Sequence, residues 1–237
     1  MFDALLEFLY PPVCVGCDAA GEYLCRECKK DLKPHSEMCP VCQSASPDYQ
    51  VCVGCRASEE FPLEGIVIGF SYTDELKKLI LALKFGHRSH VSGFLAERLS
   101  LLVQTHPHLS DALQSDKLIV TRVPSHWIRK YRVKGYNQSE LLATDLAESL
   151  DAPVIWLTRR VRYTRSQTKL NRKKRLTNLA WAFWVASTDA ELEWDEIVLI
   201  VDDITTTWST LVQVAHSIQK KHPTVKVWGA VVGRHGV

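Results

Sequence analysis

Two adjacent acids, Asp202 and Asp203, stand between an apolar run and a series of hydroxyl side chains in the stretch VLIVDDITTTWST, residues 198–210. The apolar run is typical of a buried strand, and the periodicity that follows indicates a helix. Ligands of parallel sheets bind beyond the carboxyl ends of the strands, where these carboxylates would lie. The hydroxyl-rich turn leads into a helix N-terminus, whose N–H groups and dipole favour an anion. Because carboxylates can hold sugar hydroxyls beside a bound phosphate, the stretch predicts a ribose phosphate site.

A simpler interpretation is that Asp203 and residues 205–207 only cap the helix. One cap residue would satisfy that need, and the stretch carries several more polar side chains than a cap requires. We therefore favour a binding site over a plain helix cap.

The cysteines form a second pattern with chemical meaning. All eight lie within residues 14–55, as four Cys-x-x-Cys pairs: Cys14/Cys17, Cys25/Cys28, Cys39/Cys42 and Cys52/Cys55. Two such pairs complete a tetrahedral zinc site with no open position, so the role would be structural. Disulfides are rare in a reducing cytosol and are the poorer explanation. The four pairs predict about two zinc ions per chain.

Two ways of pairing the cysteines are open. Sequential pairing places the first two pairs at one ion and the last two at another, whereas a cross-braced arrangement joins the first pair with the third. Sequential pairing closes shorter loops and has the lower entropic cost, so we favour it. Metal binding would supply much of the folding energy of so small a segment.

Charge is distributed unevenly along the chain. Residues 1–60 hold five Lys and Arg against ten Asp and Glu, whereas residues 122–175 hold fourteen against four. The basic excess indicates an anionic ligand such as phosphate or nucleic acid; a solvated basic surface is the alternative. The start of the chain lacks the features of a signal peptide, and no apolar run reaches about 18 residues. We expect a cytoplasmic protein that does not insert into membranes.

After the cysteines, strand and helix patterns alternate. Strands are predicted at residues 65–72, 117–123, 152–156, 196–201 and 225–232, and helices at 73–84, 91–104, 138–150 and 209–221. This alternation implies an α/β fold with a mainly parallel sheet covered on both faces. We predict a zinc-binding region over residues 1–60 and an α/β domain over residues 61–237. The first ten residues are predicted to form a short amphipathic helix.

Several stretches together resemble a known family. Residues 198–210 are similar to the phosphoribosyl diphosphate (PRPP) binding signature of type I phosphoribosyltransferases. Three further stretches narrow the match: LKFGHR at 83–88, the segment 123–138 that ends in KGYNQ, and the basic run 160–178. With the four cysteine pairs, the order of these motifs resembles the ComF family, also called GntX-like or competence protein F-like. The resemblance covers nearly the whole chain.

The resemblance implies a double zinc ribbon followed by a type I phosphoribosyltransferase-like domain. Asp202 and Asp203 would be the catalytic acids and would hold the ribose hydroxyls, with Mg²⁺ bridging ribose and diphosphate oxygens. The other residues of the implied PRPP site are Thr205, Thr206, Thr207, Ser209, Thr210, Lys84, Arg129, Arg132, Lys134, Arg160 and Arg172. The hydroxyls would bind the 5′-phosphate, and the cations would stabilise charge that develops on the leaving diphosphate.

Trp208 departs from the family pattern, which has glycine at this position of the loop. Glycine permits positive φ and close approach of the backbone to a phosphate. Two alternatives follow for Trp208. Either the indole swings away from the ligand, or the position has no need of positive φ.

Three functions are compatible with these motifs. An enzyme would transfer the phosphoribosyl group of PRPP to an acceptor of unknown identity. A non-catalytic protein of DNA uptake and natural competence would use the loop and the basic segments on single-stranded DNA, together with proteins of the uptake machinery. A PRPP-sensing protein would bind the ligand without turnover.

Overall fold

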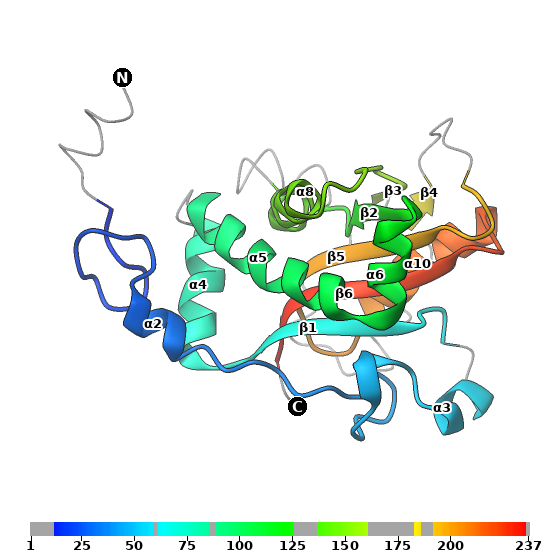
Figure 1. The fold of residues 1–237 in the computed structure, drawn as a ribbon, viewed down its shortest axis with the longest axis horizontal. Coiled ribbons are helices and arrows are strands. Elements are labelled where there is room, and N and C mark those ends of the chain that lie inside the picture. Colours follow the sequence, from blue (N-terminus) through cyan, green and yellow to red (C-terminus); the bar gives the residue numbers. More distant parts are fainter. Residues whose placement is uncertain are drawn as a thin grey trace.

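The computed structural model describes residues 12–58, 61–85, 89–125, 137–160, 183–185 and 192–235. Over these ranges the main sheet has four parallel strands in the order β1-β6-β5-β2 (Figure 1). The strands are β1 (Gly65–Ser71), β2 (Leu118–Arg122), β5 (Ile197–Thr205) and β6 (Lys226–Arg234). Their near-continuous apolar runs are typical of strands buried on both faces. The predicted parallel sheet is confirmed.

Helices cover both faces of this sheet. The helices are α4 (Asp74–Phe85), α5 (Ser89–Thr105), α6 (Pro107–Gln114), α8 (Gln138–Leu150) and α10 (Ser209–Lys221). In the view of Figure 1, α5, α6 and α8 lie in front of the strands and α10 lies behind them. Helix α6 was not predicted. It begins at Pro107 after His106, whose ring Nδ1 accepts from the Leu109 N–H at 3.2 Å.

Strand β5 extends further than the predicted range 196–201. Its pairing with β6 continues through Asp202 opposite Val231 and Thr205 opposite Arg234. The two acids therefore lie inside the last part of a paired strand instead of in the turn after it. Pairing with β6 therefore fixes the backbone from which the two carboxylate side chains extend.

The strand predicted at residues 152–156 is reduced to one parallel bridge between Val154 and Val120. Pro153 lies in this segment and has no N–H to donate, so a regular ladder cannot form there. The backbone still accepts and donates locally, because the Val120 N–H donates to the Pro153 carbonyl at 2.9 Å. Two short antiparallel strands, β3 (Thr158–Arg160) and β4 (Phe183–Val185), were not predicted, since three residues are too few to show a period.

The cysteine-rich segment packs along the outer side of β1. It contains α2 (Arg26–Lys30), a 3₁₀ turn (Pro47–Tyr49) and α3 (Val53–Ser58). The chain between α2 and the 3₁₀ turn runs beside β1 in Figure 1.

Two isolated antiparallel bridges, Pro34 with Phe70 and Gln50 with Gly65, join the segment to both ends of this strand. Tyr49 is buried in the same apolar core as β1. The division of the chain at residue 60 therefore stays a proposal from sequence.

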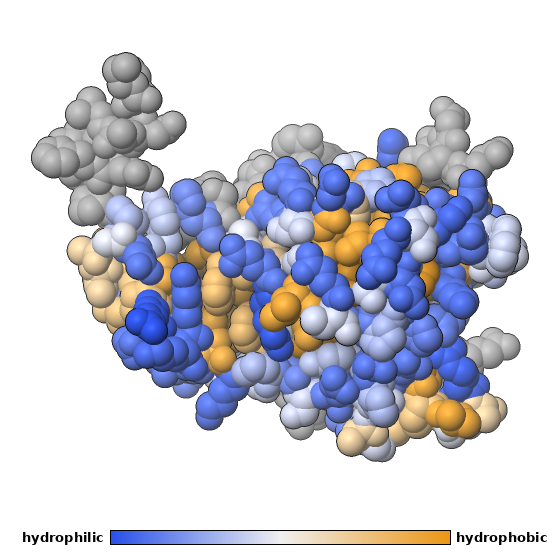
Figure 2. Space-filling model, viewed as in Figure 1, coloured by the Kyte–Doolittle hydropathy of each residue, from blue (hydrophilic) through white to orange (hydrophobic). Residues whose placement is uncertain are grey.

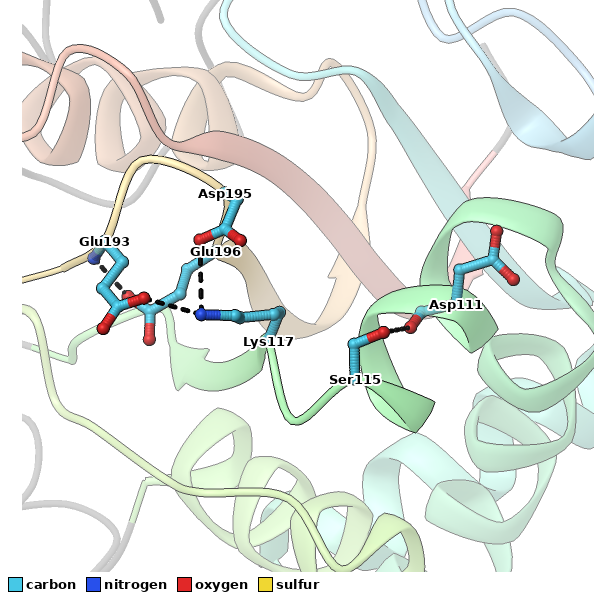
Figure 3. A network of polar contacts seen from close by, with 6 residues as sticks. All are labelled: Asp111, Ser115, Lys117, Glu193, Asp195 and Glu196. Carbon is cyan, nitrogen blue, oxygen red and sulfur yellow. Dashed lines mark hydrogen bonds and ion pairs between the residues drawn. The ribbon is translucent and has the colours of Figure 1, made fainter.

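A charged network occupies the amino edge of the sheet (Figure 3). Lys117 Nζ, just before β2, lies 2.6 Å from Glu193 Oε2 and 3.4 Å from Asp195 Oδ1. The Glu193 N–H donates to Glu196 Oε2 at 2.6 Å. Exposed ion pairs of this kind contribute little stability, and their effect here is to tie the turn before β5 to the start of β2.

The surface is largely polar on the side that Figure 2 shows. Hydrophilic side chains cover much of α5, α6 and α8, and a small apolar patch lies over α3, where Val53 is 87% exposed. No helix within the described ranges has the length and apolar character needed to cross a membrane.

Candidate anion and zinc sites

The carboxyl edge of the sheet brings together residues from three distant parts of the chain. Asp202 and Asp203 come from the end of β5, Lys84 from the last turn of α4, and Ser139 from the first turn of α8. Lys84 Nζ lies 2.5 Å from Asp203 Oδ2. The Ser139 hydroxyl donates to Asp202 Oδ1 at 2.7 Å. The structure thus places one predicted cation directly against the predicted acids.

The electrostatics of the two acids differ. Burial and the neighbouring Asp203 charge raise the pKa of Asp202 to about 7, although Ser139 and the Asp203 N–H oppose the shift. Burial pulls the pKa of Lys84 down, but the charges of Asp203 and Asp202 outweigh it and the net shift is upward. Lys84 therefore stays charged beside Asp203, and Asp202 exchanges its proton near neutral pH. A bound cation would displace that proton.

The loop between β5 and α10 is closed by its own hydrogen bonds. The Trp208 N–H donates to the Thr205 hydroxyl at 3.1 Å, and the Thr207 and Ser209 hydroxyls lie 2.5 Å apart. Thr205 and Ser209 are buried, whereas Thr206, Thr207 and Thr210 are partly exposed. Thr205 thus shapes the loop, and the partly exposed threonines of the stretch are Thr206, Thr207 and Thr210.

The structure shows both the backbone conformation of Trp208 and the direction of its indole. Its φ is +59°, so the residue does adopt the left-handed conformation that glycine favours. The indole is only 4% exposed and packs in the apolar core, with the Arg234 guanidinium carbon 5.2 Å from its ring centroid. The ring therefore lies in the apolar core and not on the surface of the loop.

Helix α10 begins at Ser209 without a side-chain cap, because Trp208 occupies the N-cap and an indole has no acceptor atom. The first N–H groups of a helix have no intrahelical partner. Together with the helix dipole, they favour an anion at this end. The Thr205 hydroxyl accepts from the Trp208 N–H just before this helix, so a capping role for Thr205 stays compatible with the structure.

Two arginines at the same edge were missed from the sequence. Arg122 ends β2, with Nε 3.1 Å from Glu140 Oε2 and its guanidinium carbon 4.8 Å from the Trp156 centroid. Arg234 ends β6 and is buried. A signal was present, since each is the basic residue that closes an apolar strand, LIVTR and GAVVGR.

The eight cysteines gather into two groups of four. The ligand atoms within each group lie within 4.8 Å of one another: Cys14, Cys17, Cys25 and Cys28 in the first, and Cys39, Cys42, Cys52 and Cys55 in the second. Sequential pairing is therefore confirmed, and the cross-braced alternative is wrong.

One thiol in each cysteine group has a lowered pKa, whereas other thiols of the same groups have a raised one. Burial raises the pKa of the Cys14 thiol, but backbone N–H donors, including those of Cys25 and Gly16, outweigh it and lower the pKa to about 6. The Ser44 hydroxyl is the main cause that lowers the pKa of Cys42 to about 6. Thiolates at tetrahedral spacing fit structural zinc.

Comparison with known proteins agrees with both parts of the molecule. Residues 5–56 match the double zinc ribbon domain family. Competence protein F of Haemophilus influenzae is 32% identical over 227 residues, covering 91% of this chain and 95% of that protein. DNA utilization protein YhgH of Salmonella typhimurium is 32% identical over 210 residues, 86% and 88% of the two chains. YhgH of Escherichia coli K12 is 30% identical over 226 residues, 92% and 96%. The chain belongs to the competence protein F family.

The family resemblance also implied five basic residues for the PRPP site besides Lys84, and the structure describes one of them. Arg160 is described as the last residue of β3 and pairs in register with Phe183. The other predicted cations, Arg129, Arg132, Lys134 and Arg172, lie outside the described residues. Strands β3 and β4 come before and after residues 161–182 in the sequence, and they pair with Arg160 opposite Phe183.

Proposed function

We propose that the carboxyl edge of the sheet binds PRPP or a related ribose phosphate. The observation that carries the proposal is the adjacency of paired carboxylates on β5 and the uncapped start of α10, joined by one loop. The loop N–H groups and the hydroxyls of Thr206, Thr207 and Thr210 would hold the 5′-phosphate. Asp202 and Asp203 would accept hydrogen bonds from the ribose hydroxyls.

The acids also suit Mg²⁺, which prefers oxygen ligands and keeps several waters. When bound, the ion would neutralise diphosphate charge. Lys84 now holds Asp203 and would turn toward the diphosphate as the ligand arrives. Arg129, Arg132, Lys134, Arg160 and Arg172 are the further cations proposed for that group.

A transfer reaction would follow from this binding mode. The lone pair of an acceptor would form a bond to the anomeric carbon of PRPP, and the bond from that carbon to the diphosphate oxygen would break. Diphosphate would leave with the electron pair, and fixed cations would stabilise its charge. The acceptor class is open, and a PRPP sensor without turnover would use the same contacts.

Calorimetric titration with PRPP and Mg²⁺ tests the proposal. We expect binding by the parent and a loss of at least about tenfold in affinity for Asp202→Asn/Asp203→Asn, since each lost charged hydrogen bond is worth about 1.5–3 kcal/mol. Asp111→Asn is the matched control, because Asp111 is exposed on α6 at the opposite edge. The proposal fails if the parent does not bind, or if the double variant binds as well as the control.

A second candidate comes from the names of the relatives, which speak of competence and DNA utilization. We infer a role in DNA uptake, in which the basic segments contact single-stranded DNA. Binding of a fluorescent oligonucleotide should then weaken steeply with salt, because each phosphate contact releases counterions. Competition by PRPP would place both ligands at one site. Salt-independent binding, or none, would contradict the DNA role.

A further inference from the structure

Arg234 is a buried cation without a carboxylate partner among the described residues. It is the last residue of β6 and is 8% exposed. Nη1 donates to the Met38 sulfur at 3.2 Å, and Nε has no acceptor within the described part of the chain. Its guanidinium lies against the Trp208 indole.

These contacts compensate the charge only in part. A thioether is a weak acceptor, so the bond to Met38 does not replace the hydration that the guanidinium loses. The face of Trp208 attracts a cation, and this attraction grows where water is excluded. A buried charge normally has an ionic partner, because desolvation is costly. Among the described residues, the arrangement is therefore short of one negative charge.

The position of Arg234 indicates where an anion would compensate its charge. Arg234 and Thr205 are register partners on β6 and β5. The Thr205 hydroxyl accepts from the Trp208 N–H, and Trp208 is the residue on which α10 begins. The buried cation thus lies against Trp208, in the loop that also carries the partly exposed Thr206 and Thr207.

We propose that Arg234 is a positioning residue of the anion site. Its charge, held against Trp208, raises the affinity of the loop for phosphate. The inference rests on the proposed ribose phosphate site. A unit charge about 10 Å from a phosphate at an effective dielectric constant of about 20 changes affinity by about tenfold. Arg234 touches no ligand in this scheme and acts through the loop.

Two substitutions separate charge from packing. Arg234→Met keeps the unbranched apolar stem and removes the charge, whereas Arg234→Lys keeps the charge and loses the planar group. Arg98→Met is the matched control. Arg98 also stacks on an aromatic ring, with its guanidinium carbon 5.8 Å from the Phe70 centroid, and its Nε donates to the Gly69 carbonyl at 3.2 Å.

The affinity for PRPP with Mg²⁺ and the thermal midpoint are measured for all four proteins. We expect about tenfold weaker binding for Arg234→Met, a change within about threefold for Arg234→Lys, and none for Arg98→Met. The midpoint of Arg234→Met should equal or exceed that of the parent, because an apolar side chain replaces a poorly paired buried charge.

Different failures have different meanings. Unchanged affinity in Arg234→Met overturns the inference and leaves the proposed function standing. Equal losses in Arg234→Met and Arg234→Lys, with lowered midpoints, overturn it in favour of a packing role. A parent that binds neither PRPP nor inorganic phosphate removes the proposed function, and the inference with it.

Discussion

Trp208 sits in a conformation that costs a non-glycine residue about 1–2 kcal/mol. The buried indole offsets this cost, since truncation of a buried Trp typically loses about 3–5 kcal/mol. We therefore expect Trp208→Gly to relieve the strain and still lower the free energy of unfolding by about 1–4 kcal/mol in urea titration.

Trp194→Gly is the matched control, because Trp194 is 76% exposed and its loss should cost little. Equal losses in the two variants would mean that the Trp208 indole contributes no core packing.

Asp202 should give the protein a pH-dependent stability. Its pKa is raised from 3.8 to about 7, so the folded state binds more protons than the unfolded state between these values. The free energy of unfolding contributed by this group therefore falls as pH rises through that window. Asp202→Asn cannot ionise and keeps the acceptor for Ser139.

We expect Asp202→Asn to be more stable than the parent by about 1–3 kcal/mol above pH 8, with little difference near pH 4, in denaturant titrations. Asp111→Asn, at an exposed site, should show no such pH dependence of the difference. A constant difference across pH for Asp202→Asn would mean that the carboxyl does not titrate in this window.

At the scale of elements, hydrophobic periodicity predicted the strands and helices whose positions depend on burying an apolar face. The four long strands and the helices 138–150 and 209–221 appear where their apolar patterns place them. Periodicity could not show where β5 ends, because its continuation through Thr205 depends on β6 as a partner. It also missed β3 and β4, whose pairing across residues 161–182 depends on tertiary contacts.

Strand β1 begins at a glycine for a steric reason. A Cβ on Gly65 would lie 2.5 Å from the Tyr49 carbonyl oxygen and would also collide with Trp228. Gly65→Ala must push the 3₁₀ turn away from the strand, and we expect a loss of about 1–3 kcal/mol in the free energy of unfolding.

Gly93→Ala is the control for Gly65→Ala. Gly93 lies inside α5, and a Cβ added there would meet no neighbouring atom within 4 Å, so alanine should stabilise by about 0.5–1 kcal/mol. Opposite signs for two identical substitutions are the expected result of thermal or urea unfolding. A neutral Gly65→Ala would show that the turn is loosely packed on β1.

At the scale of the molecule, the two cysteine clusters differ in how they join the body. The second cluster is close to the buried residues Met38 and Tyr49, and the His106 Nε2 lies 2.8 Å from the Asp48 carbonyl oxygen. The first cluster joins the body through side chains: Cys14 and Leu24 lie in the apolar core, and Lys78 Nζ donates to the Gly16 carbonyl at 2.8 Å. The segment of the second cluster also forms a backbone bridge to β1, between Gln50 and Gly65.

We therefore expect Cys42→Ser to lower the thermal midpoint of the whole protein more than Cys17→Ser, although both cysteines are exposed. Elemental analysis should find about two zinc ions in the parent and about one in each variant. Circular dichroism at a helical wavelength reports the midpoint. Identical midpoints would mean that the second cluster is no more coupled to the sheet than the first.

The candidate site was predictable only in its local part. Adjacent acids and hydroxyls in one stretch identified the edge of β5, and the Cys-x-x-Cys spacing identified the metal ligands. The meeting of Arg234, Trp208 and Met38 joins three distant parts of the chain, and no local pattern in the sequence encodes it. The contact between Ser139 and Asp202 was missed for the same reason.

The segment along β1 also affects whether separate molecules associate. Strand edges present unpaired N–H and C=O groups that can recruit another chain. Here residues near Pro34 and Gln50 cover the outer edge of β1, and Val154 covers that of β2. A chain shortened to residues 61–237 would uncover the β1 edge, and we expect it to self-associate through that strand. The zinc region would then protect the sheet from aggregation as well as bind metal.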